Sequence, residues 1–574
     1  MICNKCVRNI TIIMIVFFCL SILASQTRPN IVFIFSDDQS WPHAGAYGDS
    51  VVRTPIFDKI AKQGVLFNNA FVASPSCSPS RAAVLTGRNI WELKSASNLH
   101  GVFPDSLLTY PKILQDAGYE VGKRGKGWGP GRSDVSWAKN PAGASVATFA
   151  SFYNNRDTSK PFCYWFGSTN PHRPYAKGEG LASGKNPDKV VLPKFLPDSP
   201  EIRSDILDYY QEIESFDKEA KEVYETLLND GALQNTMIVI SSDNGMPFPR
   251  AKANLYDGGT RVPLAIMWQG KIPAGRVVDD FVNLMDLAPT YLEAAGEPIP
   301  QSMTGKSFYS TLISKSEGWV DNTRDRVYMA RERHTSARDN NYGYPSRAIR
   351  TKEYLYIWNI HSERWPAGNP NGYEDVDGSP SKEWMLSNRT PTDKNYFELA
   401  FGTRPEHELY DLKRDPHQLK NAAYNGAYIP IRDSLRKMLE TYLRKTKDPH
   451  LVGNGADFET YPQVRTIRDI KPVTPTTPYI DSLQGNPTGT KDKGFFNPYL
   501  SKVKWKKTVE GWTFVNKNSF DVVVHVYSLL GNEVNSKKVS AFGQVILRNN
   551  KETGLFIVEI KRGKQLLKSP VILI

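Results

Sequence analysis

The sequence predicts an α/β protein with a large mixed sheet flanked by helices, a smaller antiparallel-sheet subdomain after it, and a terminal β-sandwich. Three observations lead to this prediction. Apolar strands alternate with amphipathic helices from Pro29 to about Gly296, which is typical of a mostly parallel sheet with helices on both faces. Shorter, aromatic-rich segments follow as far as His450. The last eighty or so residues alternate strongly between apolar and polar side chains, as short strands do.

The first domain, residues 28–302, carries its expected elements in a regular order. Thr54 and Pro55 provide an N-cap and a first helical residue for one of the helices. The expected strands are 30–36, 65–72, 119–125, 162–168, 236–243 and 262–268, and the expected helices are 54–63, 110–118, 200–229 and 283–296. In open sheets of this kind ligands bind beyond the carboxyl ends of the strands. Polar residues that follow a strand are therefore the candidates for a site.

The remainder of the chain divides into three parts. Residues 303–460 form the smaller antiparallel α+β subdomain, in which 348–359 and 407–416 are typical of strands and turns. Residues 461–494 are rich in Pro, Thr and Gly and have the composition of a linker. Residues 495–574 are expected to form the terminal β-sandwich.

Residues 1–24 have the pattern of a secretory signal peptide. Lys5 and Arg8 precede an apolar run, and Ala24 or Ser25 is a small residue suited to cleavage. A membrane anchor is the alternative, but the run is short for a spanning helix. We expect a secreted or cell-surface protein, with the periplasm as an alternative location and no transmembrane segment in the mature chain.

The cysteine usage singles out one residue. Cys3, Cys6 and Cys19 leave with the signal peptide, so only Cys77 and Cys163 remain, too few for a disulfide framework. Cys163 lies in an apolar run that is typical of a buried strand, where packing explains it. Cys77 lies in a polar turn that contains a proline, and packing does not explain it.

The formal net charge of +12 comes from 72 Lys and Arg against 60 Asp and Glu. A positive field concentrates a polyanionic substrate. Nucleic acid is the rival ligand, but the sequence has no basic helix with interleaved aromatics and no zinc-finger spacing. Part of the excess lies in the C-terminal tail, which weakens any link between the charge and an active site. We expect no nucleic-acid partner.

Acidic residues follow two of the expected strands. Asp37 and Asp38 end the first strand, and their adjacent carboxylates repel each other unless a cation lies between them. Asp243 and Asn244 follow a later strand and offer a carboxylate and an amide oxygen. These ligands suit Ca²⁺ or Mg²⁺. A solvated loop and a plain turn are the alternatives for the separate pairs, but two acidic strand ends in one α/β domain favour a shared site.

The stretch Cys77-Ser78-Pro79-Ser80-Arg81, followed by Leu85-Thr86-Gly87, resembles the signature of the formylglycine-dependent sulfatases. The segments "DNGMPFPRAKANLYDGG", "NPHRP", "MDLAPT" and "ELYDLKRDP" extend the resemblance over Pro29 to about His450. It looks nearest to the heparan N-sulfatase branch, which includes bacterial enzymes acting on algal polysaccharides such as ulvan. The implied fold is that of the alkaline phosphatase superfamily. A protein-tyrosine-phosphatase loop is excluded because it needs a longer cysteine-to-arginine spacing.

The resemblance also implies roles for individual residues. A maturation enzyme would oxidise Cys77 to Cα-formylglycine (3-oxoalanine), and one Ca²⁺ would be held by an oxygen of that residue. The other implied ligands are Asp37, Asp38, Asp243 and Asn244. Arg81 would hold the hydrated aldehyde. Lys126, His172 and Lys252 match the family's active-site lysines and histidine, and His334 is a further candidate substrate ligand.

One position departs from the family pattern. Trp128 stands where the Gly-Lys-x-His element of the family has histidine. An indole does not exchange protons, so another residue must act as acid or base. His172 is the first candidate proton donor and Lys252 the second, while His43 and His334 are further histidines that the fold can bring near.

These observations predict a secreted, Ca²⁺-dependent sulfatase acting on a sulfated polysaccharide or its oligosaccharides, with ulvan favoured. The alternatives are a heparan-type N- or O-sulfatase, a phosphate or phosphonate hydrolase of the same superfamily, and a polysaccharide-binding protein with a decayed site. The terminal domain resembles the sorting domain of type IX secretion cargo, which implies the type IX machinery as a partner. A carbohydrate-binding or fibronectin-like module is the alternative for that domain.

Overall fold

The computed structural model describes residues 28–388 and 396–464, together with the strands that lie within 503–573. The chain divides into two compact units, Met1–Gly485 and Asn486–Ile574. This division falls within the predicted linker, most of which lies outside the described residues, as does the predicted signal peptide. Among the described residues, no helix combines the length and the apolar character that crossing a membrane requires.

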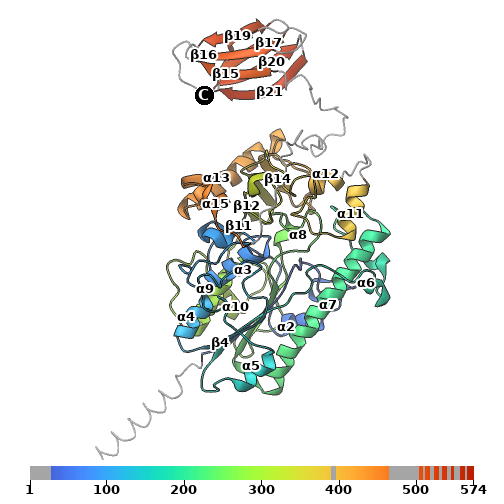
Figure 1. Ribbon diagram of the computed structural model, residues 1–574, viewed down its shortest axis with the longest axis vertical. Helices are drawn as coiled ribbons and strands as arrows, with labels where there is room; N and C mark the ends of the chain where they lie inside the picture. The colour runs from blue at the N-terminus through green and yellow to red at the C-terminus, as the bar shows by residue number, and fades with distance from the viewer. Residues whose placement is uncertain are drawn as a thin grey trace, which may run out of the picture. The chain divides into compact units, whose positions relative to one another are not determined.

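The first unit is built on an eight-stranded mixed sheet (Figure 1). In sheet order its strands are β5 (Ala144–Ser145), β4 (Glu120–Gly125), β6 (Phe162–Gly167), β1 (Asn30–Ser36), β7 (Thr236–Ser242), β8 (Leu264–Met267), β2 (Val65–Phe67) and β9 (Arg276–Val278). The strands from β5 to β7 are parallel. β8 runs antiparallel to both of its neighbours, and β2 pairs in parallel with β9.

One predicted strand is wrong. The run 65–72 does not form a single strand but two short ones, β2 and β3 (Ala70–Phe71), and β3 pairs with β10 (Val282–Asn283) in a separate small sheet. Asn68 and Asn69 make the break. Their side-chain amides donate to Asp279, at 2.8 Å to the carboxylate and 2.8 Å to the backbone carbonyl. These bonds turn the chain out of the large sheet.

Helices cover both faces of the sheet, as the alternation predicts (Figure 1). Ile31, Phe33 and Phe35 of β1 pack in one core cluster with residues of α3, α4 and α9, and Val32 and Ile34 pack in another with residues of α2, α5 and α7. The helices are α2 (Pro55–Gln63), α3 (Cys77–Thr86), α4 (Tyr110–Asp116), α5 (Phe149–Asn155), α6 (Glu179–Ala182), α7 (Pro200–Asn229), α8 (Asp257–Thr260), α9 (Leu287–Ala295), α10 (Tyr309–Ile313), α11 (Pro380–Ser387), α12 (Tyr396–Phe401), α13 (Ile429–Lys445), α14 (Pro449–Val452) and α15 (Asp457–Thr460).

A second, four-stranded antiparallel sheet follows, as predicted. Its strands are β11 (Arg326–Arg331), β12 (Ser346–Thr351), β13 (Tyr354–Asn359) and β14 (His407–Asp411). Helix α13 packs against it through Leu435, Leu439 and Leu443, and Tyr442 stacks on Tyr328 with ring centroids 3.8 Å apart. This sheet carries the loops that later contribute to the site.

The second unit contains two antiparallel sheets. One has the order β15 (Val503–Thr508), β16 (Gly511–Asn516) and β19 (Gln544–Arg548). The other has the order β18 (Glu533–Val539), β17 (Val522–Ser528), β20 (Phe556–Arg562) and β21 (Gln565–Leu573). The sandwich expected for these residues needs two such sheets, and their packing against each other stays a prediction.

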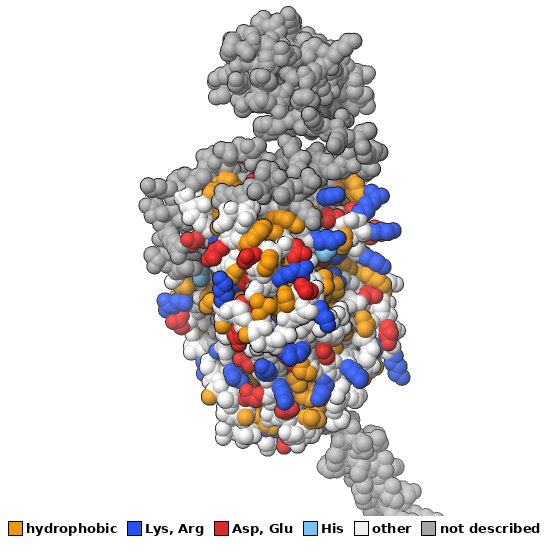
Figure 2. Space-filling model, turned by 90° about the vertical axis from the view of Figure 1, so that its right-hand side faces the viewer, with side chains coloured by type: hydrophobic (Ala, Val, Ile, Leu, Met, Phe, Trp, Pro, Cys, Tyr) orange, Lys and Arg blue, Asp and Glu red, His pale blue; other side chains and the backbone are white. Residues whose placement is uncertain are grey.

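Figure 2 shows one face of the described region, on which Lys and Arg side chains are interspersed with Asp and Glu. The positive net charge is not gathered into a single basic patch on this face. Such an arrangement gives little support to a nucleic-acid footprint there.

Candidate active site

The two acidic strand ends predicted from the sequence meet at one edge of the sheet. β1 and β7 are parallel neighbours, and Ser36 pairs with Ser242 in register, so the residues that follow them lie side by side. The Asp38 N–H donates to Asp243 Oδ1 at 3.0 Å. Asp38 has φ of +80°, a left-handed conformation that costs energy for a residue other than glycine. The turn therefore holds its carboxylate in a fixed position.

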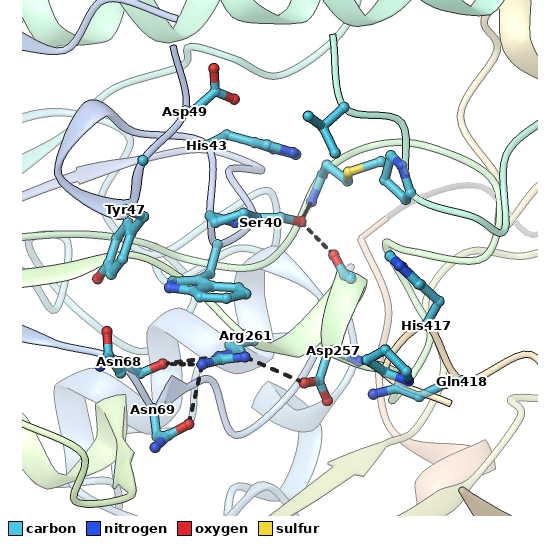
Figure 3. Close-up of a pocket in the computed structure, with 18 of the residues that line it drawn as sticks. Ser40, His43, Tyr47, Asp49, Asn68, Asn69, Asp257, Arg261, His417 and Gln418 are labelled. Carbon is cyan, nitrogen blue, oxygen red and sulfur yellow. Dashed lines mark hydrogen bonds and ion pairs between the residues drawn. The ribbon is translucent and has the colours of Figure 1, made fainter. Parts of the chain in front are cut away.

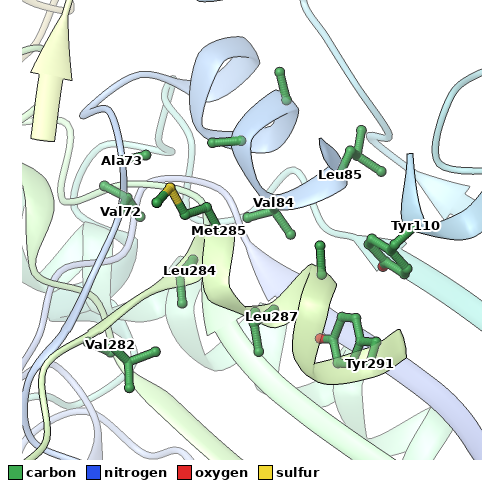
Figure 4. Packing of buried hydrophobic residues seen from close by; sticks show 14 of the residues in the cluster. Val72, Ala73, Val84, Leu85, Tyr110, Val282, Leu284, Met285, Leu287 and Tyr291 are labelled. Atoms are coloured by element: carbon green, nitrogen blue, oxygen red, sulfur yellow. The ribbon is translucent and has the colours of Figure 1, made fainter. Parts of the chain in front are cut away.

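Helix α3 begins at Cys77 and directs its N-terminus at this edge. Ser76 precedes the helix, but its hydroxyl makes no capping bond and instead lies 2.8 Å from His334 Nδ1. The other end of the helix is anchored in the core, where Val84 and Leu85 belong to the same cluster as Met285 and Tyr291 (Figure 4). The packing fixes the helix, and the helix fixes Cys77.

Asp37, Asp38, Cys77 and Asp243 form a group that we call the inner cluster. Their ligand atoms all lie within 4.8 Å of one another, and each residue is at most 2% exposed. Cys77 Sγ lies 3.4 Å from Asp37 Oδ1 and 3.9 Å from Asp38 Oδ1. Burial raises the pKa of the Cys77 thiol well above its usual range. The unmodified thiol is therefore protonated and is a poor nucleophile at neutral pH.

Arg81 supports the inner cluster from within the fold. It is fully buried, its Nε donates to Asp243 Oδ2 at 2.7 Å, and its Nη1 donates to the Lys126 carbonyl at 2.7 Å. Its Nη2 lies 3.6 Å from Asp37 Oδ1 but has no hydrogen-bond partner among the described residues. Burial raises the pKa of Asp243 to about 6. The charge of Arg81 works against this rise, and the neighbouring carboxylate of Asp37 adds to it.

Four further side chains, which we call the outer ring, surround the inner cluster: Lys126, His172, Lys252 and Asp377. Lys126 Nζ donates to both oxygens of Asp37, at 2.6 and 2.9 Å. Burial alone would raise the pKa of Asp37, but Lys126 and Arg81 outweigh it and hold this pKa well below its usual range. Asp37 is therefore ionised.

Lys252 lies between two carboxylates. Its Nζ donates to Asp38 Oδ2 at 2.7 Å and lies 3.1 Å from Asp377 Oδ2. Burial alone would lower the pKa of Lys252, but Asp377 and Asp38 outweigh it and raise this pKa well above its usual range. The ammonium therefore keeps its proton, which makes Lys252 an electrostatic group rather than a ready proton donor.

His172 is the most exposed member of the outer ring, with 37% of its side chain accessible. Its Nδ1 lies 2.6 Å from the Arg173 carbonyl oxygen. Because a carbonyl only accepts hydrogen bonds, Nδ1 carries the hydrogen. Nε2 lies 3.9 Å from Asp38 Oδ2 and faces the inner cluster. A protonated His172 can therefore donate its Nε2 proton toward the site.

The ligand set fits a hard cation. The three buried carboxylates lie close enough to repel one another, and one cationic side chain contacts each of them: Lys126, Lys252 or Arg81. Asn244 Oδ1 is buried beside them and has no hydrogen-bond partner among the described residues. An unpartnered buried carbonyl oxygen next to three carboxylates is the donor set that Ca²⁺ or Mg²⁺ prefers.

Comparisons with known proteins agree with this geometry. The family model "Sulfatase" matches residues 29–297, and the model "N-sulphoglucosamine sulphohydrolase, C-terminal" matches residues 250–366. An ulvan-active sulfatase of Formosa agariphila is 30% identical over 443 residues, which cover 74% of this chain and 82% of the relative. The chain belongs to the sulfatase family. It is a sulfuric ester hydrolase.

Other relatives and structures extend the comparison. The human N-sulphoglucosamine sulphohydrolase is 27% identical over 480 residues, covering 74% of this chain and 92% of the relative. A solved structure of a protein in complex with its substrate, D-glucosamine-2-N,6-O-disulfate, aligns with a TM-score of 0.56 at 20% identity. It covers 75% of this chain and 99% of that chain. At this identity the match supports the fold alone.

Trp128, the one departure from the sulfatase signature, has a structural explanation, and the other two candidate histidines have clear environments. Trp128 is 3% exposed, its Nε1 donates to the Ser78 carbonyl at 2.8 Å, and its ring packs edge-on against Phe103. It braces the first turn of α3 instead of exchanging protons. His334 is also buried, and burial lowers its pKa to about 3, so it is neutral. His43 bonds to Tyr209 at 3.2 Å and makes no contact with the inner cluster.

Asp377 was missed by the sequence analysis. It comes from the loop before α11, far along the chain from the other members of the outer ring, and no recognisable motif surrounds it. Burial alone would raise the pKa of Asp377, but Lys252 and the nearby His334 and His172 lower it to about 2. Only the acidic run Glu374–Asp377 could have drawn attention to this loop.

Proposed function

We propose that the chain is a secreted, Ca²⁺-dependent sulfatase that removes sulfate esters from an acidic polysaccharide or its oligosaccharides. The observation that carries this proposal is Cys77, buried at the start of α3 among three carboxylates and flanked by Arg81, Lys126 and Lys252. A carboxylate cluster suits a cation, and the surrounding positive groups suit a sulfate.

Asp37, Asp38, Asp243 and Asn244 would hold Ca²⁺, together with residue 77. When bound, the cation would supply positive charge that stabilises negative oxygen atoms of the sulfate group. Residue 77 would be Cα-formylglycine, which supplies a hydrated aldehyde hydroxyl as the nucleophile toward sulfur. Because Cys77 is 2% exposed, a maturation enzyme must reach it before the chain folds.

The chain's own residues would bind and polarise the sulfate. Arg81 Nη2, which has no acceptor among the described residues, is free to donate to an oxygen of the reacting group. Lys126 and Lys252 add fixed positive charge on either side, and preorganised charge of this kind is usually the largest catalytic term. His172 would donate its Nε2 proton to the departing sugar oxygen as a general acid.

Ulvan is the favoured substrate class because the 30% identical relative is named as acting on ulvan. A heparan-type N- or O-sulfatase is the second candidate, favoured by the match of residues 250–366 to the C-terminal model of the N-sulphoglucosamine sulphohydrolases. The test is free sulfate released from a panel of ulvan, heparan and chondroitin oligosaccharides. Release from ulvan alone supports the first assignment, and release from heparan alone replaces it with the second.

Aryl esters test the reaction class without the sugar. Turnover of an aryl sulfate far above that of the matching aryl phosphate is expected. The reverse order would make the protein a phosphohydrolase, and no turnover of either ester by protein whose residue 77 carries the aldehyde would contradict the catalytic proposal.

We also propose that residues 1–24 direct export and that residues 495–574 are a type IX sorting domain. The two antiparallel sheets of the second unit support the latter. Deleting residues from 495 onwards should leave sulfate release from soluble oligosaccharides unchanged and keep the protein from reaching the cell surface or medium. A folded truncated protein without activity would assign the tail to substrate binding instead.

A further inference from the structure

A cavity of about 800 Å³ lies outside the catalytic site (Figure 3). It is lined by the loop that follows Asp38, by the turn at Asn68 and Asn69, by residues 189–195, and by loops of the four-stranded sheet. No member of the inner cluster or the outer ring lines it. The cavity is therefore a separate feature that the proposed reaction does not use.

The acidic side chains of this cavity already have partners. Asp257 accepts two bonds from Arg350, at 3.0 and 2.9 Å. Asp279 accepts from Asn68 at 2.8 Å, and Asp49 accepts from two backbone N–H groups. The acids are thus satisfied within the protein and do not call for a cationic ligand.

The lysines of the cavity are in the opposite situation. Lys189 and Lys352 are exposed and form neither an ion pair nor a side-chain hydrogen bond with any described residue. Lys352 Nζ lies over the ring of Trp319, 5.3 Å from its centroid, which holds the charge at the cavity wall. Unpaired cations beside satisfied acids favour an anionic ligand.

Two buried hydrogen-bond donors in the wall also lack acceptors. Trp41 Nε1 and Gln418 Nε2 have no hydrogen-bond partner in the part of the chain that the structure describes, and both residues line the cavity. Gln418 Oε1 accepts from the Asp257 N–H at 2.9 Å, so its amide is oriented with the nitrogen left over. An unsatisfied buried donor is costly. Both nitrogens are closed to solvent in this structure, so an acceptor oxygen reaches them only after the wall side chains shift.

Part of the remaining wall is apolar. Val191 is 81% exposed, an unusual environment for a valine at a cavity mouth, and Leu192 and Trp319 continue the apolar surface. A sugar ring combines apolar C–H faces with oxygen-rich edges, and an acidic sugar adds a negative charge. That combination matches the apolar wall, the unpaired donors and the free lysines.

We propose that this cavity is a second binding site, which takes an acidic sugar unit through its sulfate ester or uronate carboxylate. The choice of a saccharide rests on the proposed function, whereas the choice of an oxygen-rich anion rests on the cavity itself. Ser40 and Met246 line the cavity two residues after Asp38 and Asn244, and the Met246 N–H donates to Ser40 Oγ at 2.7 Å. Binding a polymer here would raise its local concentration near the catalytic residues.

The test measures oligosaccharide binding to the full chain carrying Cys77→Ala, which cannot consume the probe. Calorimetry uses ulvan oligosaccharides of one length and the same oligosaccharides after chemical desulfation. The cavity variants are Lys189→Ala with Lys352→Ala, and separately Val191→Asp, which places a negative charge at an exposed position that cannot disturb the core. The matched controls are Lys218→Ala with Lys271→Ala, and Val135→Asp, which make the same charge changes outside the cavity.

We expect each cavity variant to bind the sulfated probe about tenfold more weakly, the effect of losing roughly 1.4 kcal/mol, while the controls bind as the parent does. If the parent still binds the desulfated probe and the cavity variants do not, the carboxylate is the recognised group. Equal affinity in cavity and control variants would overturn the inference. Aryl sulfate turnover by protein whose residue 77 carries the aldehyde tests the proposed function separately, so the two failures are distinguishable.

Discussion

The inner cluster and the outer ring differ in the way the fold holds them. Every residue of the inner cluster is at most 2% exposed and comes from a strand end or the start of α3. In the outer ring the exposed side-chain fraction is 17% for Lys126, 28% for Asp377 and 37% for His172, whereas Lys252 is buried at 5%. The inner cluster fixes the chemistry at the sulfate, whereas the three accessible side chains of the outer ring face the sugar that carries the sulfate. Substitutions in the two groups should therefore fail differently.

The largest effect is expected from the inner cluster. Cys77→Ala should lower sulfate release by a factor on the order of 10⁶, as loss of a covalent nucleophile does, on sugar and aryl sulfates alike. Cys163→Ala is the matched control, because Cys163 is the other described cysteine and is buried in β6, away from the site. It should retain turnover. Comparable activity in the two variants would remove Cys77 from the mechanism.

His172→Ala tests the outer ring and should depend on the leaving group. Losing a general acid costs about 10²- to 10⁴-fold, and that loss should appear with sugar sulfates, whose alkoxide needs a proton. An aryl sulfate with an acidic phenol needs little protonation and should be much less affected. The measurement is kcat/KM for both substrates. Equal losses would mean that His172 only holds the sulfate.

Asp377→Asn should have a moderate effect. Lys252 would keep Asp38 at 2.7 Å but lose the carboxylate 3.1 Å away, and its ammonium would be held less firmly. We expect kcat/KM to fall about tenfold, equivalent to roughly 1.4 kcal/mol of transition-state stabilisation. Asp134→Asn, at an exposed aspartate, is the control. An unaffected Asp377→Asn enzyme would show that Asp38 alone positions Lys252.

The smallest effect concerns stability in acid. Burial lowers the pKa of His334 to about 3, whereas a histidine in the unfolded chain has a pKa of about 6.5. Between these values the unfolded chain binds a proton that the native protein does not, so the stability that His334 contributes is present above about pH 6.5 and is lost as pH falls toward 3.

His334→Gln should remove this pH-dependent contribution to the stability of the native protein. Between pH 7 and pH 5 its unfolding temperature should fall by about 2–4 °C less than that of the parent. His361→Gln, which changes a histidine with an accessible ring, should follow the parent. If the unfolding temperatures of His334→Gln and the parent fall by the same amount between pH 7 and pH 5, His334 does not resist protonation in the native state.

Local sequence signals account for much of this site. Asp37, Asp38, Asp243 and Asn244 were predictable because each follows a strand whose apolar run marks where it ends, and parallel neighbours bring such ends together. Cys77 and Arg81 were predictable from a short motif. The large sheet and the second sheet followed from periodicity in the same way.

The remaining features depend on contacts that the sequence does not encode locally. The break after β2 is set by Asn68 and Asn69 bonding to Asp279, more than two hundred residues away. Asp377 enters the site only because the small sheet packs beside the large one. Trp128 occupies a motif position but turns inward to bond Ser78, which only its packing environment could reveal.

The central claim is that the inner cluster is a cation site, and Ca²⁺ withdrawal tests it most directly. Thermal unfolding and sulfate release should be measured on the mature enzyme after exhaustive chelation and again during Ca²⁺ addition. The account predicts loss of turnover and a lower unfolding temperature after chelation, because Asp37, Asp38 and Asp243 then repel one another. Both should return with Ca²⁺, which at 100 times its dissociation constant stabilises the native state by about 2.7 kcal/mol. Unchanged activity and unchanged unfolding after complete metal removal would contradict the account.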